Sequence, residues 1–223
     1  MIPDPRIVWS ASGAKVWQAS LAGCDEDSCM ALLSPDELRR ADRYGEAAFR
    51  RRFVVRRALL RKIAGGEADR DPADIAVAVD PGGKPRLIGI PLEISMAFSG
   101  DEALFSVSRR GPVGVDIERI DPGFDFAGIL ADHFSASERK EFAALSAEER
   151  RFRFFRAWTR KEACAKALGV GLAVPMSAYE VSAPRADGLR LEVAGRGHLL
   201  VFDVPAPLWH AAAVALQEGG QDP

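Results

Sequence analysis

Two carboxylates stand two positions apart near the middle of this 223-residue chain. They are Asp116 and Glu118, in the segment Gly114-Val115-Asp116-Ile117-Glu118. Residues two apart project from the same face of a strand, so both carboxylates would face one way. Adjacent carboxylates repel each other unless a cation lies between them. The spacing therefore indicates a cation site, although a solvated strand end shows the same pattern.

A helical pattern some forty residues later adds a third carboxylate and two lysines. A helix is expected over 147–168, because Ser146-Ala147-Glu148-Glu149 forms a capping box at its start. Glu162 and Lys166 fall on a partly apolar stripe of its helical wheel, and Lys161 falls on another. Glutamate and lysine four residues apart also form routine surface ion pairs. Charges on apolar stripes need partners, so these residues are candidates for a site.

Three carboxylates brought to one place suit a particular chemistry. Asp116, Glu118 and Glu162 would offer the oxygen ligands that Mg²⁺ prefers, with water and phosphate oxygens as the remaining ligands. Nearby lysines would neutralise the phosphates. Because positioning and charge neutralisation dominate phosphoryl-type transfer, the pattern predicts metal-assisted chemistry at a phosphate. It does not name the substrate.

Basic residues concentrate between positions 39 and 62, where ten Arg or Lys stand against Asp42 and Glu46. In the helix expected over 46–64, Arg56 falls within the apolar stripe and Arg52 at its edge. An arginine so placed usually serves a fixed anion or carboxylate. The outward arginines indicate a solvated face that would attract an acidic protein partner. Nucleic acid is disfavoured, because the net charge is -2 and few aromatic residues interleave with the arginines.

Composition narrows the class of protein further. With 48% hydrophobic and 28% charged residues, the chain reads as an ordinary soluble globular protein. Its three cysteines and three histidines are scattered, which argues against a disulfide scaffold or a structural zinc site. No basic segment followed by an apolar run opens the sequence, and no long apolar run occurs. We expect a cytoplasmic protein with no membrane partner.

The expected elements repeat in order along the chain. A short helix should begin after Ser34, which forms a capping box with Glu37, and the helix over 46–64 should end at Gly65-Gly66. Strands are expected over 14–21, 75–79, 93–97, 103–108, 113–118, 177–182, 189–193, 198–204 and 209–216, and a further helix over 137–145. The predicted fold class is α+β, with two similar halves related by a pseudo-two-fold. Each half, 1–110 and 111–223, would pack a small, mainly antiparallel sheet on a long helix.

The two acidic motifs resemble those of the 4'-phosphopantetheinyl transferase superfamily. The resemblance rests on Val113-Gly114-Val115-Asp116-Ile117-Glu118, then Trp158-Thr159-x-Lys161-Glu162-Ala163-x-x-Lys166 and Gly169-x-Gly171-Leu172. Further matches are Ser34-Pro35, Arg52, Gly83-Lys84-Pro85 and Phe134-Ser135-x-x-Glu138. The length and the suspected halves are similar to the Sfp-like branch, whose two-halved monomeric enzymes modify carrier proteins of peptide, polyketide and fatty-acid synthesis.

This resemblance implies a reaction and a site. The 4'-phosphopantetheine arm of coenzyme A would pass to a serine of an apo acyl or peptidyl carrier protein, releasing adenosine 3',5'-bisphosphate. The implied residues are Asp116, Glu118 and Glu162 for Mg²⁺ or Mn²⁺, Lys166 at the reacting phosphate, Glu162 or Glu138 as proton acceptor, and Arg40, Arg52, Lys84 and Lys161 for coenzyme A. Glu138 also fits a capping box after Ser135, which alone would account for it.

One segment departs from the family pattern. Ala97 and Phe98 stand where relatives commonly have a serine and a histidine that hold the 3'-phosphate of coenzyme A. Neither a methyl nor a phenyl group donates a hydrogen bond. Either the arginines compensate, or dephospho-coenzyme A is tolerated, or the chain is a non-catalytic or repurposed coenzyme A or nucleotide-binding homologue. A general metal-dependent phosphohydrolase is a further alternative. The intact acidic motifs favour an enzyme.

Overall fold

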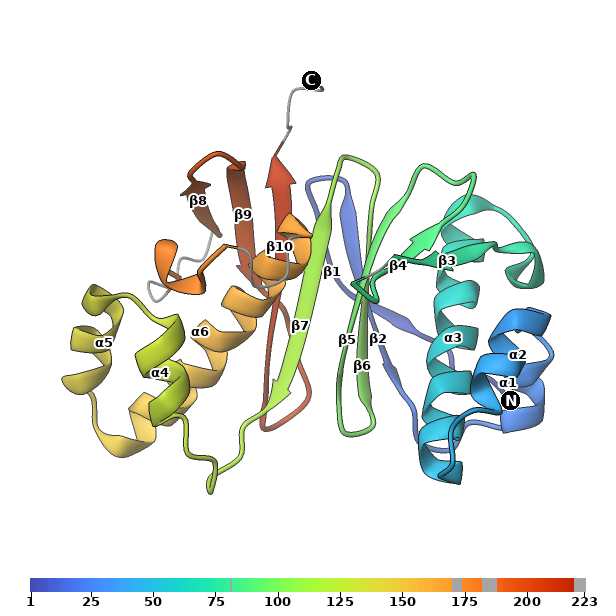
Figure 1. Ribbon diagram of the computed structural model, residues 1–223, viewed down its shortest axis with the longest axis horizontal. Coiled ribbons are helices and arrows are strands. Elements are labelled where there is room, and N and C mark those ends of the chain that lie inside the picture. The colour runs from blue at the N-terminus through green and yellow to red at the C-terminus, as the bar shows by residue number, and fades with distance from the viewer. Residues whose placement is uncertain (81, 170–173, 182–187, 219–223) are drawn as a thin grey trace.

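The chain forms two similar halves that meet through their sheets (Figure 1). The computed structural model describes residues 1–80, 82–169, 174–181 and 188–218. Two four-stranded antiparallel sheets pack face to face in the centre, and a 22-residue helix covers the outer face of each. This architecture confirms the expected α+β class.

The first half is built on the sheet β1-β2-β6-β5. Its strands are β1 (Arg6–Ala11), β2 (Ala14–Ser20), β5 (Glu93–Ser99) and β6 (Glu102–Ser108). Its helices are α1 (Glu26–Met30), α2 (Pro35–Ala41), α3 (Ala47–Ala68) and the 3-10 turn η1 (Pro72–Asp74), followed by a hairpin of β3 (Val77–Val79) and β4 (Pro85–Leu87). Leu59, Leu60 and Ile63 of α3 are buried against the sheet. The hydrophobic effect at this face holds the long helix in place.

The second half repeats the arrangement with the sheet β7-β10-β9-β8. Its strands are β7 (Val113–Arg119), β8 (Leu189–Val193), β9 (Gly197–Asp203) and β10 (His210–Glu218). Its helices are α4 (Ala127–His133), α5 (Ala136–Ala143), α6 (Ala147–Leu168) and the 3-10 turn η3 (Met176–Ala178). Ser146 caps the start of α6, and Gly169 ends it with a φ of 66°. Both predicted ends of this helix are confirmed.

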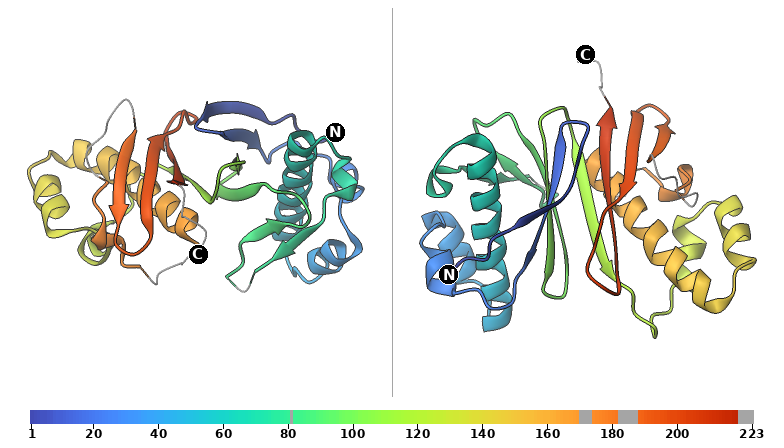
Figure 2. Two further views of the ribbon diagram at one scale, coloured as in Figure 1. Left: turned by 90° about the horizontal axis from the view of Figure 1, so that it is seen from above. Right: turned by 180° about the vertical axis from the view of Figure 1, so that it is seen from behind.

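The two sheets share a small apolar core, formed by residues such as Val16, Ala97 and Val115. Edge strands β5 and β7 are joined by side chains, since the backbone N–H of Val115 donates to Ser95 Oγ at 3.2 Å and that of Arg119 to Ser99 Oγ at 2.8 Å. Seen from above, the long helices lie on opposite sides of the paired sheets (Figure 2). A domain boundary at residue 110 stays a prediction, because the halves share this core.

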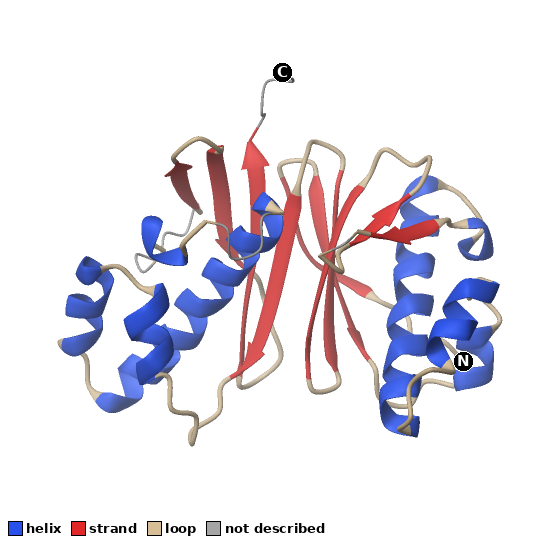
Figure 3. Cartoon of the chain, in the orientation of Figure 1, coloured by secondary structure: helices blue, strands red, loops and turns tan. Residues whose placement is uncertain are grey.

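Two expected features are wrong. Helix α3 continues through Gly65 and Gly66 to Ala68, and Asp69 ends it with a φ of 53°. A Cβ on Gly65 would lie 2.8 Å from the carbonyl oxygen of Arg70, so this glycine allows close packing and does not stop the helix. The second wrong feature is the strand expected over 177–182. Its start is occupied by the 3-10 turn η3 (Met176–Ala178), and residue 182 lies outside the described residues (Figure 3).

Among the described residues, five short elements were not expected, namely β1, β4, α1, α4 and the 3-10 turn η1. Elements of three to seven residues show too little periodicity to be recognised in a sequence. All three cysteines, Cys24, Cys29 and Cys164, are free and buried. In the part of the chain that the structure describes, every helix is too short or too polar to span a membrane.

Candidate active site

A glycine brings the acidic strand and the lysine-bearing helix into direct contact. A Cβ on Gly114 of β7 would lie 2.0 Å from the carbonyl oxygen of Ala163 and 2.5 Å from the backbone nitrogen of Ala167, both on α6. Only glycine therefore allows this approach. It sets Lys166 of α6 over Asp116 of β7. Sequence reasoning used Gly114 only as part of a motif, although a glycine inside a strand can itself signal such an approach.

Asp116 is buried, and only one of its carboxylate oxygens is satisfied. Lys166 Nζ donates to Asp116 Oδ1 at 2.6 Å and to the carbonyl oxygen of Val115 at 3.2 Å. Asp116 Oδ2 is buried without a hydrogen-bond partner. Burial raises the pKa of Asp116, whereas the charge and hydrogen bond of Lys166 lower it. A buried carboxylate oxygen without a partner is unfavourable, and a bound cation would satisfy it.

The other two predicted carboxylates stand in the same electrostatic field. Burial raises the pKa of Glu118 to about 7; Asp116 and Glu162 raise it as well, and Lys166 opposes them. Burial also raises the pKa of Glu162, again with help from Asp116 and opposition from Lys166 and His133. Three mutually repelling carboxylates thus share one nearby lysine. Their number and oxygen chemistry fit a divalent cation.

The side chains do not form a finished metal site as they stand. Among the described residues, no three His, Cys, Asp or Glu side chains are arranged to hold a metal ion. Glu162 lines a cavity between the halves, whereas Glu118 lines a separate hollow of about 300 Å³ beside Phe124 and Trp158. The donor set is suitable, but rotation of at least one side chain would be needed to complete it. The magnesium triad stays a prediction.

The cavity between the halves measures about 620 Å³ and is lined by residues from both. The hairpin β3–β4 supplies Lys84, β5 supplies Met96 and Phe98, and α6 supplies Glu162 and Lys166. Lys84 Nζ donates to the carbonyl oxygens of Lys166 at 3.0 Å and Val113 at 3.4 Å, and burial lowers the pKa of Lys84. A cavity of this volume suits a nucleotide-sized ligand. Three predicted site residues, Lys84, Glu162 and Lys166, therefore meet at one cavity.

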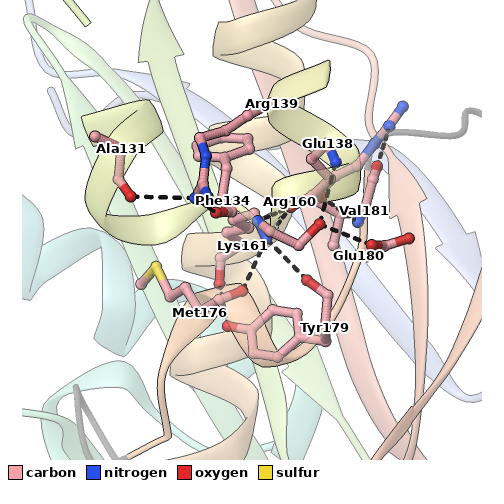
Figure 4. A network of polar contacts seen from close by, with 11 residues as sticks. Ala131, Phe134, Glu138, Arg139, Arg160, Lys161, Met176, Tyr179, Glu180 and Val181 are labelled. Atoms are coloured by element: carbon pink, nitrogen blue, oxygen red, sulfur yellow. Dashed lines mark hydrogen bonds and ion pairs between the residues drawn. The ribbon is translucent and has the colours of Figure 1, made fainter. Parts of the chain in front are cut away.

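Lys161 and Glu138 instead form a closed network (Figure 4), and neither side chain belongs to the lining of this cavity. Lys161 is fully buried; its Nζ donates to the carbonyl oxygens of Met176 and Tyr179, each at 2.8 Å, and lies 2.9 Å from Glu138 Oε2. Glu138 Oε1 accepts from the backbone N–H of Val181 at 2.8 Å. Both side chains are fully occupied and inaccessible. In this conformation the geometry thus opposes the expected coenzyme A contact of Lys161 and the expected catalytic role of Glu138.

The predicted arginines also lie outside the lining of the cavity. Arg40 is exposed, with its guanidinium carbon 5.4 Å from the centre of the Phe53 ring. Arg52 Nη2 lies 3.9 Å from Asp101 Oδ1. Arg56 has its guanidinium carbon only 3.9 Å from the centre of the Phe98 ring. Residues Gly171 and Leu172 of the third motif lie outside the described residues.

Comparison with known proteins gives one consistent result. Residues 112–210 match the model of the 4'-phosphopantetheinyl transferase superfamily. The chain is 32% identical over 174 residues to 4'-phosphopantetheinyl transferase HetI of Nostoc sp. (strain PCC 7120). The aligned region covers 76% of this chain and 73% of that protein. It is 28% identical over 162 residues to a 4'-phosphopantetheinyl transferase of Bacillus subtilis, covering 72% and 71% respectively.

A third relative and a solved structure extend the comparison. The chain is 31% identical over 145 residues to a putative 4'-phosphopantetheinyl transferase of Synechocystis sp., covering 64% of this chain and 59% of that protein. The solved holo-[acyl-carrier-protein] synthase of Thermotoga maritima shares 20% identity, with a TM-score of 0.35 over 49% of this chain and 64% of that one.

Proposed function

The chain belongs to the 4'-phosphopantetheinyl transferase superfamily, and we propose on that premise that it transfers the phosphopantetheine arm of coenzyme A to a carrier-protein serine. The reaction would depend on magnesium and release adenosine 3',5'-bisphosphate. One observation carries the proposal. At a single cavity Lys84 of the first half meets Glu162 and Lys166 of the second, beside the unpartnered Oδ2 of Asp116.

The residues of this cavity suit transfer at a pyrophosphate. Lys84 and Lys166 would neutralise phosphate oxygens, and Asp116, Glu118 and Glu162 would hold Mg²⁺. When bound, the ion would supply further neutralisation of the charge that develops on the leaving phosphate. The serine oxygen would attack the β-phosphorus as the bond to the bridging oxygen breaks. Glu162 lines the cavity together with Lys166, and this position supports it as acceptor of the serine proton.

One chain supplies both sides of the cavity, which supports a monomeric enzyme. Glu138 and Lys161 have no contact with substrate in this proposal. Their network joins α5, α6 and the segment after α6, so they would act by holding α6 in position. The carrier protein and coenzyme A are the only partners that the proposed reaction requires.

A mass-shift assay tests the function. The protein is incubated with coenzyme A, MgCl₂ and an apo peptidyl carrier protein, and the carrier is weighed by mass spectrometry. We expect the carrier to gain one phosphopantetheine group. Chelation of the metal by EDTA should abolish the gain, and Asp116→Ala and Lys166→Ala should each reduce it strongly.

The alternative functions give different results in the same assay. A non-catalytic homologue would bind coenzyme A without changing the mass of any acyl or peptidyl carrier. A phosphohydrolase would release phosphate in the absence of carrier. Unchanged turnover by the Lys166→Ala variant would contradict the role of that lysine at the reacting phosphate.

A further inference from the structure

Arg56 of α3 rests on an aromatic platform at the edge of the cavity. Its guanidinium carbon lies 3.9 Å from the centre of the Phe98 ring. Phe98 is fixed in turn by an edge-on contact with the buried ring of Phe105, at 5.9 Å and 82°. The face of an aromatic ring attracts a cation, and a guanidinium that stacks in this way keeps its in-plane N–H groups available.

Arg56 lacks the carboxylate partner that its neighbours possess. Arg57 and Arg61 share Glu37, at 3.3 Å and 2.7 Å. No carboxylate oxygen among the described residues lies within 4.0 Å of Arg56, and its Nε is buried without a hydrogen-bond partner. A half-buried guanidinium with an unsatisfied donor is unfavourable unless an anion completes it.

A second arginine adds to this uncompensated charge. Burial lowers the pKa of Arg56, and the next largest cause is the positive charge of Arg52. Arg52 is itself only weakly paired, because the half-exposed carboxylate of Asp101 lies 3.9 Å from its guanidinium group. Two guanidinium groups therefore repel each other with little acidic compensation. Such a pair is a favourable place for a phosphate group.

The pair lies next to the cavity of the proposed reaction. Phe98 lines that cavity and carries Arg56 on its ring, whereas Lys84 and Lys166 line other parts of the wall. Positive charge is thus found at two places, one beside the carboxylates and one beside Phe98. Coenzyme A likewise carries phosphate at two places, the pyrophosphate and the monoester on the ribose.

We propose that Arg56, held on the Phe98 ring, and Arg52 bind the ribose phosphate monoester of coenzyme A. This inference rests on the proposed function. It selects one of the explanations left open for Ala97 and Phe98, namely that arginines compensate for the missing serine and histidine. Phe98 contributes no hydrogen bond itself. Its ring instead holds the guanidinium group of Arg56, which would donate the hydrogen bonds to the phosphate.

The test compares ligands with and without the monoester. Binding of adenosine 3',5'-bisphosphate and of adenosine 5'-monophosphate is measured by calorimetry for the wild type, Arg56→Gln, Arg56→Lys, Phe98→Leu and the control Lys62→Gln. Lys62 lies on the same helix and pairs with Asp4. Loss of a charge-assisted contact should weaken binding of the bisphosphate about tenfold or more in Arg56→Gln. Phe98→Leu should weaken binding of the bisphosphate less than Arg56→Gln does. Arg56→Lys keeps the positive charge, so its affinity should lie between those of Arg56→Gln and the wild type. Lys62→Gln should match the wild type.

The monophosphate should bind all five proteins equally. In turnover, Arg56→Gln should raise KM for coenzyme A and leave KM for dephospho-coenzyme A unchanged. A wild type that binds both nucleotides equally, or an Arg56→Gln variant that weakens both alike, would overturn the proposal. Thermal unfolding checks that each variant folds. Since the calorimetry needs no turnover, failure of the anion site is distinguished from failure of the transferase reaction.

Discussion

The two halves share one structural device, although only one of them carries the acidic motif. In each, a short helix opens with a capping box whose glutamate is buried: Ser34 with Glu37 in the first half, Ser135 with Glu138 in the second. Each glutamate pairs with a cation of the long helix, Glu37 with Arg61 at 2.7 Å and Glu138 with Lys161 at 2.9 Å.

The cations also make matching contacts with the chain that follows the long helix. Arg61 donates to the carbonyl oxygens of Pro72 and Ala73 in η1, at 3.2 Å and 3.1 Å. Lys161 donates to the carbonyl oxygen of Met176, in η3, and to that of Tyr179, which directly follows η3. Because the first half keeps this device without the acidic motif, the device belongs to the frame. This match between the halves supports the proposal that Glu138 and Lys161 act by positioning α6.

The difference between the halves lies on the strand beneath each long helix. On β2, Trp17 and Ala19 pack into the core below α3. On β7, the face below α6 carries Asp116 and Glu118 instead, with Gly114 at the point of closest approach. One frame thus supports an apolar face in one half and an acidic face in the other. The acidic face of β7 is thus a local change on a shared frame, and it lies against the helix that carries Glu162 and Lys166.

The largest effect should come from Gly114→Ala. Its new methyl group would meet the backbone of α6, so we expect a loss of about 3 kcal/mol in the free energy of unfolding and at least about a hundredfold loss of transfer activity. Urea unfolding and the mass-shift assay measure the two effects. Gly128→Ala in α4 is the control, because its methyl group would meet no atom within 4 Å. A fully active Gly114→Ala variant would show that close approach of α6 is unnecessary.

A paired substitution tests the shared device directly. Removal of one partner of a buried ion pair leaves the other uncompensated, so Glu37→Gln and Glu138→Gln should each lower the free energy of unfolding by about 3 kcal/mol. The folded fraction of both variants should retain kcat within a few fold. If Glu138→Gln instead lost kcat by a factor of a thousand with unchanged stability, Glu138 would be the proton acceptor after all.

The smallest effect concerns pH and should arise in the second half. The pKa of Glu118 is raised to about 7 in the folded protein. Its contribution to the free energy of unfolding is therefore fully present below its unfolded pKa and is lost as pH rises through 7. We expect the free energy of unfolding of the metal-free protein to fall by about 1 kcal/mol as pH rises from the unfolded pKa of Glu118 through 7. Mg²⁺ should raise Tm more at pH 8 than at pH 6, since protons compete for the same oxygens.

Thermal unfolding at the two pH values, with and without MgCl₂, measures this dependence. Glu118→Gln should remove most of it, while Glu37→Gln in the first half should not. An equal Mg²⁺ effect at both pH values would argue against a cation site that includes Glu118.

Local signals in the sequence were sufficient for the long helix of the second half and for most of the strands. Capping residues and periodicity gave α6 at both ends, and strand spacing placed Asp116 and Glu118 on one face. Long-range packing was not visible. The sequence could not show that Gly65 lies inside a helix against Arg70, or that Glu138 and Lys161 satisfy each other. Such pairings depend on how distant segments meet, which no local period encodes.

The buried cysteines have a consequence for a protein that handles coenzyme A, which ends in a thiol. Burial raises the pKa of Cys29 to about 11 and that of Cys164 to about 12, and it also raises the pKa of Cys24. A thiol must ionise and be reached before it can exchange with a disulfide. All three are buried and protonated at neutral pH, so oxidised forms of the substrate would find no protein sulfur with which to form a mixed disulfide.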